Sequence, residues 1–199
     1  MHYTLCDMIA DLAQNAVEAD AGRVTVEFIE TESDIAFYIR DNGKGMSAET
    51  LERVKDPFYT DGTKHPGRKI GLGIPFLIQT AAETGGEWNI TSREGEGTTV
   101  YGKFDLKNID TPPIGDVTGL FRQILMMPDM CACSERCEIE IIRKRNRSET
   151  VPADRFEYRI SRSDLLGALG ELQTAASLAL LGDFLLSQER DLESEHEET

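Results

Sequence analysis

Basic residues are scarce in this sequence of 199 residues: Lys and Arg total 21 against 36 Asp and Glu, which gives a formal net charge of −15. Phosphate backbones and anionic lipid surfaces attract basic protein surfaces, so this acidity argues against general nucleic-acid binding and against docking on anionic membranes. The N-terminus also lacks a basic and then apolar leader, so we expect a protein that is not secreted.

Long apolar runs are also absent. The longest apolar stretch, from Leu165 to Leu186, is interrupted by Glu171, Gln173 and Asp183, whereas a membrane span needs about 20 apolar residues with few charges. Only four cysteines are present, which argues against a disulfide framework. We therefore expect a cytoplasmic protein with no membrane partner, in which 40% hydrophobic residues build one sizeable core.

Hydrophobic periodicity predicts helices and antiparallel strands in the first half of the chain. Helices are predicted over 5–19, 47–54 and 74–84, and strands over 24–29, 35–40, 87–92 and 98–104. These elements predict an α+β fold for a domain of residues 1–108. We expect a two-layer α/β sandwich in which a mixed or antiparallel sheet carries helices on one face.

A Thr-Pro-Pro sequence at 111–113 marks a joint before a second, smaller part. For this part the pattern predicts a helix over 117–126, strands over 138–145 and 156–160, and one long helix over 163–188. Residues 114–188 are therefore predicted to be a small α+β extension, and the acidic tail 189–199 is predicted to be disordered. The long helix is more apolar than a surface helix needs, so we expect it to pack on the strand pair and to offer a homodimer surface.

Two polar residues share one face of the first predicted helix. Asp11 and Asn15 are four positions apart, which places a carboxylate and an amide side by side. A carboxylate can accept a proton from water, and an amide oxygen can ligate Mg²⁺. A pair of this kind standing alone is more often an ordinary solvated helix face.

A turn rich in glycine follows the second predicted strand, with the sequence Asp41-Asn42-Gly43-Lys44-Gly45. Glycines allow the backbone to approach a flat or charged ligand closely. The Asp41 carboxylate could accept a hydrogen bond from an exocyclic amine such as that of adenine. Standing alone, the segment also fits an ordinary turn.

The segment 58–73 gathers basic residues in an otherwise acidic protein, including Lys64 and Arg68, with glycines on either side. Gly71-Leu72-Gly73 then opens a helix, and backbone N–H groups at a helix N-terminus bind phosphate oxygens. Mobile glycine-rich flanks suit a lid over a ligand. A solvated basic loop is the alternative.

Two glycine patterns point to other nucleotide folds. Residues 62–69 have the glycine spacing of a P-loop but lack its Lys and Ser or Thr after the second glycine. Residues 43–48 match the dinucleotide pattern G-x-G-x-x-G/A, but Asp41 would lie beside the pyrophosphate and the flanking strands form hairpins. A dinucleotide-dependent oxidoreductase is kept as the alternative from another class.

Three cysteines in the second half, Cys131, Cys133 and Cys137, could ligate zinc or an iron–sulfur cluster. Their spacing matches no standard motif, and a fourth ligand would have to come from Cys6. Ordinary thiols around a strand are the alternative.

Five segments in order resemble the GHKL (Bergerat-fold) ATPase family, which includes sensor histidine kinases, DNA gyrase, MutL-type repair proteins and anti-sigma-factor kinases. The resemblance covers about residues 5–104. The matching segments are Asp11-x-x-x-Asn15-Ala16, Asp41 to Met46, Asp56 to Thr60, Gly71 to Ile74, and Gly95 to Thr99.

The resemblance implies roles around the nucleoside. Asp41 would receive the adenine amine, and Thr99 would support it through water. Gly43 and Gly45 would shape the floor of the adenine pocket, and Met46 belongs to the same nucleotide-binding motif.

The resemblance also implies roles around the phosphates, with ATP and Mg²⁺ as the bound groups. Asn15 would ligate Mg²⁺, and Asp11 would stand as general base where hydrolysing members carry a Glu that is one methylene longer. Residues 59–70 would form the lid. The remaining nucleotide-binding residues would be Phe58, Lys64, Arg68, Gly71, Leu72 and Gly73.

No histidine sits on a helix suited to accept a phosphoryl group, because the only histidines are His2, His65 and His196. The resemblance therefore implies a signalling ATPase or protein kinase that acts in trans on a partner protein, and not a self-contained histidine kinase. The alternative is a non-catalytic ATP sensor.

Overall fold

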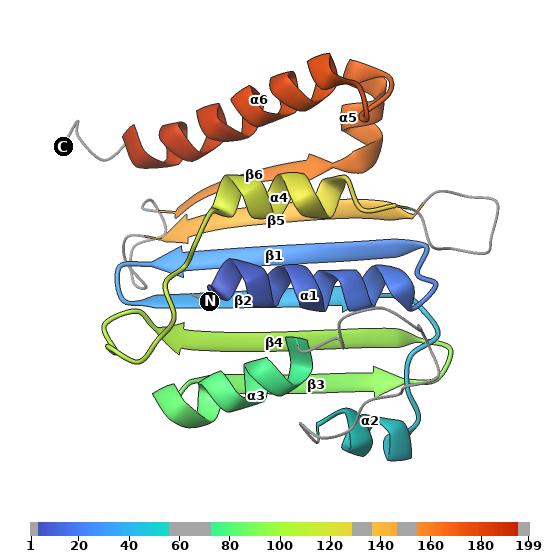
Figure 1. The fold of residues 1–199 in the computed structure, drawn as a ribbon, viewed down its shortest axis with the longest axis vertical. Coiled ribbons are helices and arrows are strands. Elements are labelled where there is room, and N and C mark those ends of the chain that lie inside the picture. Colours follow the sequence, from blue (N-terminus) through green and yellow to red (C-terminus); the bar gives the residue numbers. More distant parts are fainter. Residues whose placement is uncertain (1–3, 56–72, 129–136, 147–154, 195–199) are drawn as a thin grey trace.

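A single mixed sheet forms the framework of the computed structural model, which describes residues 4–55, 73–128, 137–146 and 155–194. The sheet has six strands in the order β3-β4-β2-β1-β5-β6, and helices cover one of its faces (Figure 1). The elements are α1 (Leu5–Glu18), β1 (Arg23–Thr31), β2 (Asp34–Asp41), α2 (Ala48–Val54), α3 (Gly73–Thr84), β3 (Glu87–Arg93), β4 (Gly97–Asp105), α4 (Val117–Leu125), β5 (Glu138–Asn146), β6 (Arg155–Ser161), α5 (Arg162–Leu169) and α6 (Ala175–Ser194). The predicted α+β fold is confirmed.

The helix-facing side of the sheet follows the alternation that the sequence predicts. Val24, Val26 and Phe28 of β1 are buried, and β2 and β4 bury alternate apolar residues in the same way. Because successive strand residues point to opposite faces, these apolar side chains form one layer beneath α1, α3 and α4.

The opposite face of the sheet is polar and held by ion pairs across strands. Glu27 of β1 accepts from Arg40 of β2 at 2.9 Å and from Lys144 of β5 at 2.6 Å. Tyr38 and Tyr101 stack beside this group with ring centroids 4.8 Å apart. Cross-strand contacts of this kind stabilise a sheet on a face that helices do not cover.

The C-terminal part continues the same sheet. Strand β5 pairs in parallel with β1 along its whole length, and β6 pairs antiparallel with β5. The buried core likewise runs from Leu5 in α1 to Leu185 in α6. The segment between residues 108 and 114, predicted to be a boundary, therefore connects two parts of one sheet.

The long helix predicted over 163–188 is wrong in one respect: the structure has two helices, α5 and α6, in its place. The chain leaves α5 at Gly170, whose φ of 71° lies in the left-handed region that favours glycine. The expectation that this part packs on the strand pair is confirmed by contacts of α5 with β5 and of α6 with β6.

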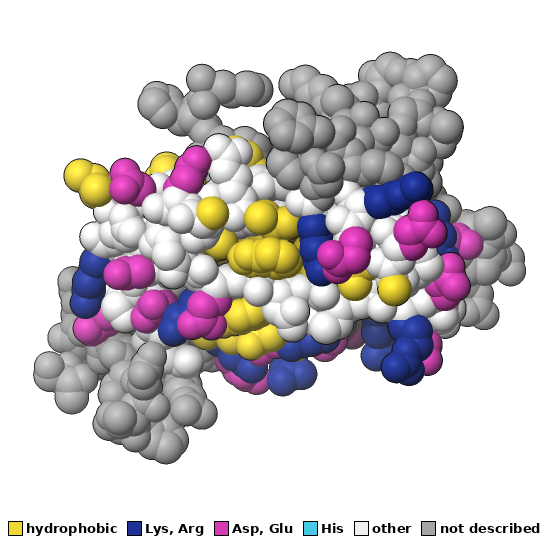
Figure 2. Space-filling view, turned by 90° about the horizontal axis from the view of Figure 1, so that it is seen from below, with side chains coloured by type: hydrophobic (Ala, Val, Ile, Leu, Met, Phe, Trp, Pro, Cys, Tyr) yellow, Lys and Arg dark blue, Asp and Glu magenta, His cyan; other side chains and the backbone are white. Residues whose placement is uncertain are grey.

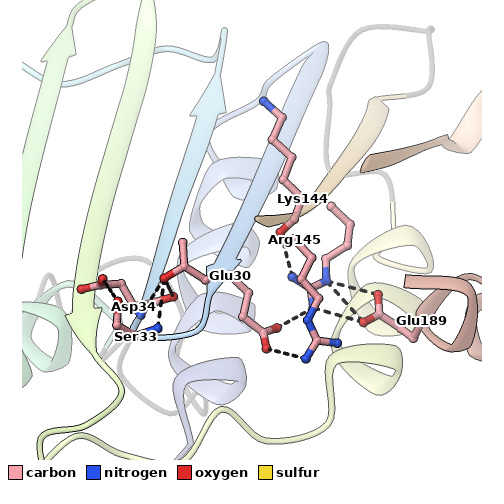
Figure 3. Close-up of polar contacts among 8 residues, drawn as sticks. Glu30, Ser33, Asp34, Lys144, Arg145 and Glu189 are labelled. Atoms are coloured by element: carbon pink, nitrogen blue, oxygen red, sulfur yellow. Dashed lines mark hydrogen bonds and ion pairs between the residues drawn. The ribbon is translucent and has the colours of Figure 1, made fainter. Parts of the chain in front are cut away.

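The predicted disorder from residue 189 is also wrong for residues 189–194, which belong to α6. Their anchor is Arg143 of β5, whose side chain is only 2% exposed. Arg143 Nη2 donates to Glu30 at 2.5 Å and Arg143 Nε donates to Glu189 at 3.2 Å. Figure 3 labels the two carboxylates, Glu30 and Glu189. Tyr158 of β6 donates its hydroxyl to the same Glu189 carboxylate. A buried cation thus ties the acidic end of the chain to the sheet.

The β3 end of the molecule keeps some apolar surface. Leu51, Ile74, Phe76 and Trp88 are partly buried there and pack against the core. Figure 2 looks onto this end and shows hydrophobic side chains in the middle, with charged ones to either side. The short helix α2 is capped by Ser47, whose hydroxyl accepts a hydrogen bond from Thr50 N.

Within the ranges that the structure describes, every helix is too short or too polar to cross a lipid bilayer.

Candidate functional site

Helix α1 carries two of the predicted site residues on one face. A capping box fixes its start, because Thr4 Oγ1 accepts from Asp7 N at 3.1 Å and Asp7 Oδ2 accepts from Thr4 N at 2.9 Å. Asp11 and Asn15 follow at helical spacing and are half-buried. The sequence thereby places a carboxylate and an amide one turn apart, as predicted.

The N-terminus of α3 begins against this face of α1. A Cβ atom at Gly73 would lie 3.2 Å from Asp11 Cβ and 3.1 Å from Leu12 Cδ2, so glycine lets the two helices approach. The positive end of the α3 dipole favours negative charge nearby, and α1 supplies it at Asp11. Gly73 therefore lies beside Asp11, the residue that the resemblance assigns as general base.

Asp41, the last residue of β2, carries a carboxylate in a partly desolvated place. Burial raises its pKa, although hydrogen bonds from the backbone N–H groups of Gly43 and Thr98 act in the opposite direction. The Gly43 bond to Oδ1 is 2.8 Å long. The fold thus holds a carboxylate in place and keeps part of its hydration away, which suits recognition of a donor such as an amine.

The turn after Asp41 is clamped at its glycines. A Cβ atom at Gly43 would lie 2.5 Å from the carbonyl oxygen of Ala19 at the end of α1. Gly45 has a φ of +62°, and a Cβ atom there would lie 1.9 Å from the carbonyl oxygen of Arg93. The backbone of this turn lies against α1 on one side and against the β3–β4 connection on the other. Neither position therefore has room for a residue larger than glycine.

A serine that the sequence analysis did not select completes the clamp. Ser92 Oγ of β3 accepts from Met46 N at 2.8 Å and lies 3.1 Å from the carbonyl oxygen of Gly97 and 2.9 Å from Thr98 Oγ1. Met46 is 46 positions away in sequence, whereas Gly97 and Thr98 lie just across the β3–β4 hairpin, where Ser92 pairs with Thr98.

The strand register places Thr98 and the predicted residue Thr99 on opposite faces of the sheet. Asp41 pairs with Thr98 across β2 and β4, whereas Thr99 pairs with Arg40. Thr98 is buried together with Val100 on the helix-facing side, and Thr99 shares the other face with Tyr101. Because a shift of one residue exchanges the faces of a strand, Thr98 is the threonine on the side of Asp41. Strict alternation along 98–104 could have given this result.

The structure brings the described site residues to one side of α1. Gly73 lies beside Asp11, and the turn at Gly43 lies beside Ala19, where Lys44 N also donates to the Ala19 carbonyl at 2.9 Å. These two points are about 12 Å apart along the helix axis, and Asn15 lies midway. The other selected residues, which are Phe58, Lys64, Arg68, Gly71 and Leu72, lie outside the described residues.

A metal ion at this site would have few protein ligands. No cluster of three or more His, Cys, Asp or Glu suited to a metal occurs among the described residues. The Asn15 amide oxygen and the Asp11 carboxylate are hard oxygen donors one turn apart, which fits Mg²⁺ held partly by phosphates.

The predicted metal role of the cysteines gains no support from the described part of the chain. Cys131 and Cys133 lie outside it. Cys6 belongs to the first turn of α1, whereas Cys137 adjoins Glu138, whose N–H donates to Gly22 beyond the end of α1. The two residues therefore lie near opposite ends of α1, whose 14 residues span about 20 Å, too far apart to share one ion. Burial raises the pKa of the Cys6 thiol to about 12, so it stays protonated at neutral pH.

Comparison with known proteins identifies the family of the first half of the chain. Residues 3–108 match the family described as "Histidine kinase-, DNA gyrase B-, and HSP90-like ATPase". Sporulation kinase C of Bacillus subtilis is 32% identical over 106 residues, which cover 52% of this chain and 24% of that protein. Sensor kinase CckA of Brucella abortus is 33% identical over 86 residues, which cover 43% of this chain and 9% of that protein.

Among solved structures, the catalytic domain of histidine kinase ThkA is 22% identical, with a TM-score of 0.39, over 53% of this chain and 65% of that one. The chain spans about a quarter or less of the curated relatives named above. The family match nevertheless covers more than half of the chain, so the chain belongs to the histidine kinase-, DNA gyrase B- and HSP90-like ATPases. It therefore carries a histidine-kinase-like ATP-binding domain.

Proposed function

We propose that this chain binds ATP with Mg²⁺ and either hydrolyses it or transfers its terminal phosphoryl group to a partner protein in trans. One observation carries the proposal: Asp11 lies where α3 begins, on the helix whose end meets the turn after Asp41. In this proposal the carboxylate for adenine comes from the end of β2, whose following turn meets the end of α1, and the carboxylate for the reacting phosphate comes from α1 itself.

In this proposal each residue has a defined task. Asp41 accepts a hydrogen bond from the adenine amine, and the clamped turn at Gly43 and Gly45 presents backbone to the base. Asn15 supplies an amide oxygen to Mg²⁺, which neutralises phosphate charge when bound. Asp11 removes a proton from the attacking water or from the hydroxyl of the acceptor.

Closure of residues 59–70 over the nucleotide is part of the proposal. These residues lie outside the described ranges, so this part rests on the family resemblance alone. The identity of the acceptor is left to experiment. An acceptor in trans is carried over from the sequence prediction, because His2, His65 and His196 all lie outside the described ranges.

The test is the rate of phosphate release from ATP with Mg²⁺ for the wild type and for Asp11→Asn. Loss of a general base lowers a rate by about 10²- to 10⁴-fold, while ATP affinity should change by no more than about twofold because the amide keeps the shape of the side chain. Glu18→Gln, in the last turn of α1, is the matched control and should keep the wild-type rate.

Phosphate release by Asp11→Asn at the wild-type rate would show that Asp11 is not the base. A wild type that binds ATP with Mg²⁺ but neither releases phosphate nor labels any protein would establish the sensor alternative instead.

A further inference from the structure

Strand β6 ends the sheet on the side opposite β3. In the part of the chain that the structure describes, its seven residues pair with β5 alone. Half of the backbone N–H and C=O groups of such a strand point away from its one neighbour and can bond to another strand. The sheet thus has an open strand position next to β6.

Helix α6 covers one face of this open strand position. Figure 1 shows α6 beyond β6 on its outer side. Tyr158 of β6 donates its hydroxyl to Glu189 of α6, and Leu181 and Leu185 of α6 are buried, so the helix belongs to the layer that covers the sheet. A helix is about 10 Å across and neighbouring strands are about 4.8 Å apart, so a helix spans about two strands. The chain supplies only one of the two, β6.

Two apolar side chains of α6 border the open strand position. Leu180 and Phe184 are 56% and 43% exposed. Gly182 faces α4, because a Cβ atom there would lie 4.0 Å from Arg122 Nη1. Leu180 and Phe184 are each two residues from Gly182, which is about 200° around an α-helix. Both therefore lie on the side of α6 away from α4, where a strand added next to β6 would pass.

The other face of β6 carries one charge of each sign. Because Tyr158 faces α6, its neighbours Glu157 and Arg159 project from the uncovered face, where their side chains are 46% and 57% exposed. Opposite charges directly across two strands stabilise a sheet, and like charges destabilise it. A strand added next to β6 would therefore be selected by the order of its own charges.

The position of α6 decides which kind of strand can enter. A second copy of this chain would bring its own α6 onto α4 and α6 of the first copy, and any strand whose sheet has helices on the same side meets the same obstacle. A single extended segment brings no helix and meets none. The net charge of −15 further favours a segment from a basic partner, through attraction at long range.

We propose that β6 and α6 bind an extended segment of a partner protein, which joins the sheet antiparallel to β6. On one face its alternate residues are apolar and pack beneath α6 against Leu180 and Phe184. On the other face it carries an acid opposite Arg159 and, two residues later, a base opposite Glu157. Backbone hydrogen bonds supply affinity in this mode of recognition, and the side chains supply specificity. The inference does not depend on the proposed catalytic function.

Two labelled peptides of identical composition test the proposed charge order. In antiparallel pairing centred on Tyr158, the peptide Thr-Val-Glu-Val-Lys-Val-Thr places Glu opposite Arg159 and Lys opposite Glu157. The peptide Thr-Val-Lys-Val-Glu-Val-Thr places like charges at both points. Fluorescence anisotropy with the full chain should show about tenfold tighter binding of the first peptide, because two favourable pairs replace two unfavourable ones.

Exchange of the two charges in the protein should reverse this preference. In the variant with Glu157→Lys and Arg159→Glu, the second peptide should bind about tenfold more tightly than the first. Both side chains are about half exposed, so the variant should stay folded.

The apolar contacts have a separate test. Leu180→Gln combined with Phe184→Gln should weaken binding of the first peptide at least about fivefold and leave the melting temperature of the free chain unchanged, since both side chains are exposed. Ile109→Gln is the matched control, because Ile109 is 96% exposed after β4 and its replacement should not affect binding.

Hydrogen exchange locates the bound peptide. Saturation with the first peptide should protect amides of β6 that exchange in the free chain, because they become bonded to the added strand. Protection confined to other strands, such as β3, would overturn the proposal. So would protection of these β6 amides in the free chain that rises with protein concentration, because a second copy would then occupy the position.

Two binding results would also overturn the proposal. One is the absence of saturable binding of either peptide up to about 1 mM. The other is equal affinity of the wild type for the two peptides, since the charges of β6 would then play no part in selection.

Discussion

At the scale of single residues, the candidate site contains a charged group that lowers the stability of the folded chain. This group is Asp41, whose carboxylate is desolvated and whose pKa is raised by burial. An acid whose pKa is raised on folding subtracts stability at neutral pH, and this penalty disappears as the pH falls through the raised value. Such a charge is consistent with selection for binding and not for folding.

Replacing Asp41 by Asn separates the two roles. The amide oxygen can still accept from Gly43 N, and the desolvated charge is removed. We expect ATP affinity to fall at least tenfold, since hydrogen bonds to charged groups contribute about 1.5–3 kcal/mol. The melting temperature should stay the same or rise. Titration calorimetry and thermal melting measure the two effects, and a variant that binds normally would exclude Asp41 from adenine recognition.

The two threonines of β4 offer a matched pair of equal substitutions. Thr98→Val removes the hydroxyl that contacts Ser92 Oγ, and should weaken ATP binding several-fold at a cost of about 1 kcal/mol in stability. Thr99→Val acts on the other face of the sheet and should change stability by less than about 0.5 kcal/mol. If only Thr99→Val weakened binding, the assignment from the strand register would be wrong.

At the scale of elements, the open face of the sheet links the two halves of the chain. Glu27 of β1 joins Arg40 of β2 to Lys144 of β5. Burial alone would raise the pKa of Glu27, but hydrogen bonds from Lys144 and Arg40 outweigh it and lower the pKa below 4.5. An acid with a lowered pKa adds stability above its unfolded value, and this stability is lost as the pH falls through the folded value.

The pH dependence of Glu27→Gln follows from that sign. At pH 7 the variant should be less stable by about 1–2 kcal/mol, because two charge-assisted bonds are weakened at a site that solvent still reaches. Below the lowered pKa of Glu27, wild type and variant should converge. Urea denaturation at several pH values measures the difference, and a gap that stays constant with pH would contradict the account.

Elements with local patterns could be predicted from the sequence, and elements set by distant contacts could not. Helical spacing predicts α1 and places Asp11 beside Asn15, because both depend on residues within a few positions. Ser92 lies 46 positions from its partner Met46, so no local pattern reveals it. The faces of Thr98 and Thr99, by contrast, follow from the alternation of buried residues along β4, which is a local pattern.

At the scale of the whole molecule, the structure joins what the sequence divides. The Thr-Pro-Pro joint predicts a separate extension, but the parallel pairing of β5 with β1 makes both parts share one sheet. The acidity of the last residues predicts disorder from residue 189, but residues 189–194 belong to α6, where Glu189 pairs with the buried Arg143. Parallel pairing needs a long crossover, and its partners therefore cannot be found from neighbouring residues.

The nucleotide site is the central claim, and calorimetric titration with ATP in the presence and absence of Mg²⁺ tests it most directly. Wild-type protein should bind ATP more tightly with Mg²⁺, and Asn15→Ala should lose that dependence while staying folded, because the amide oxygen of α1 is the proposed metal ligand. Absence of binding by folded wild-type protein would contradict the account. So would an Asn15→Ala variant that binds ATP with the full dependence on Mg²⁺.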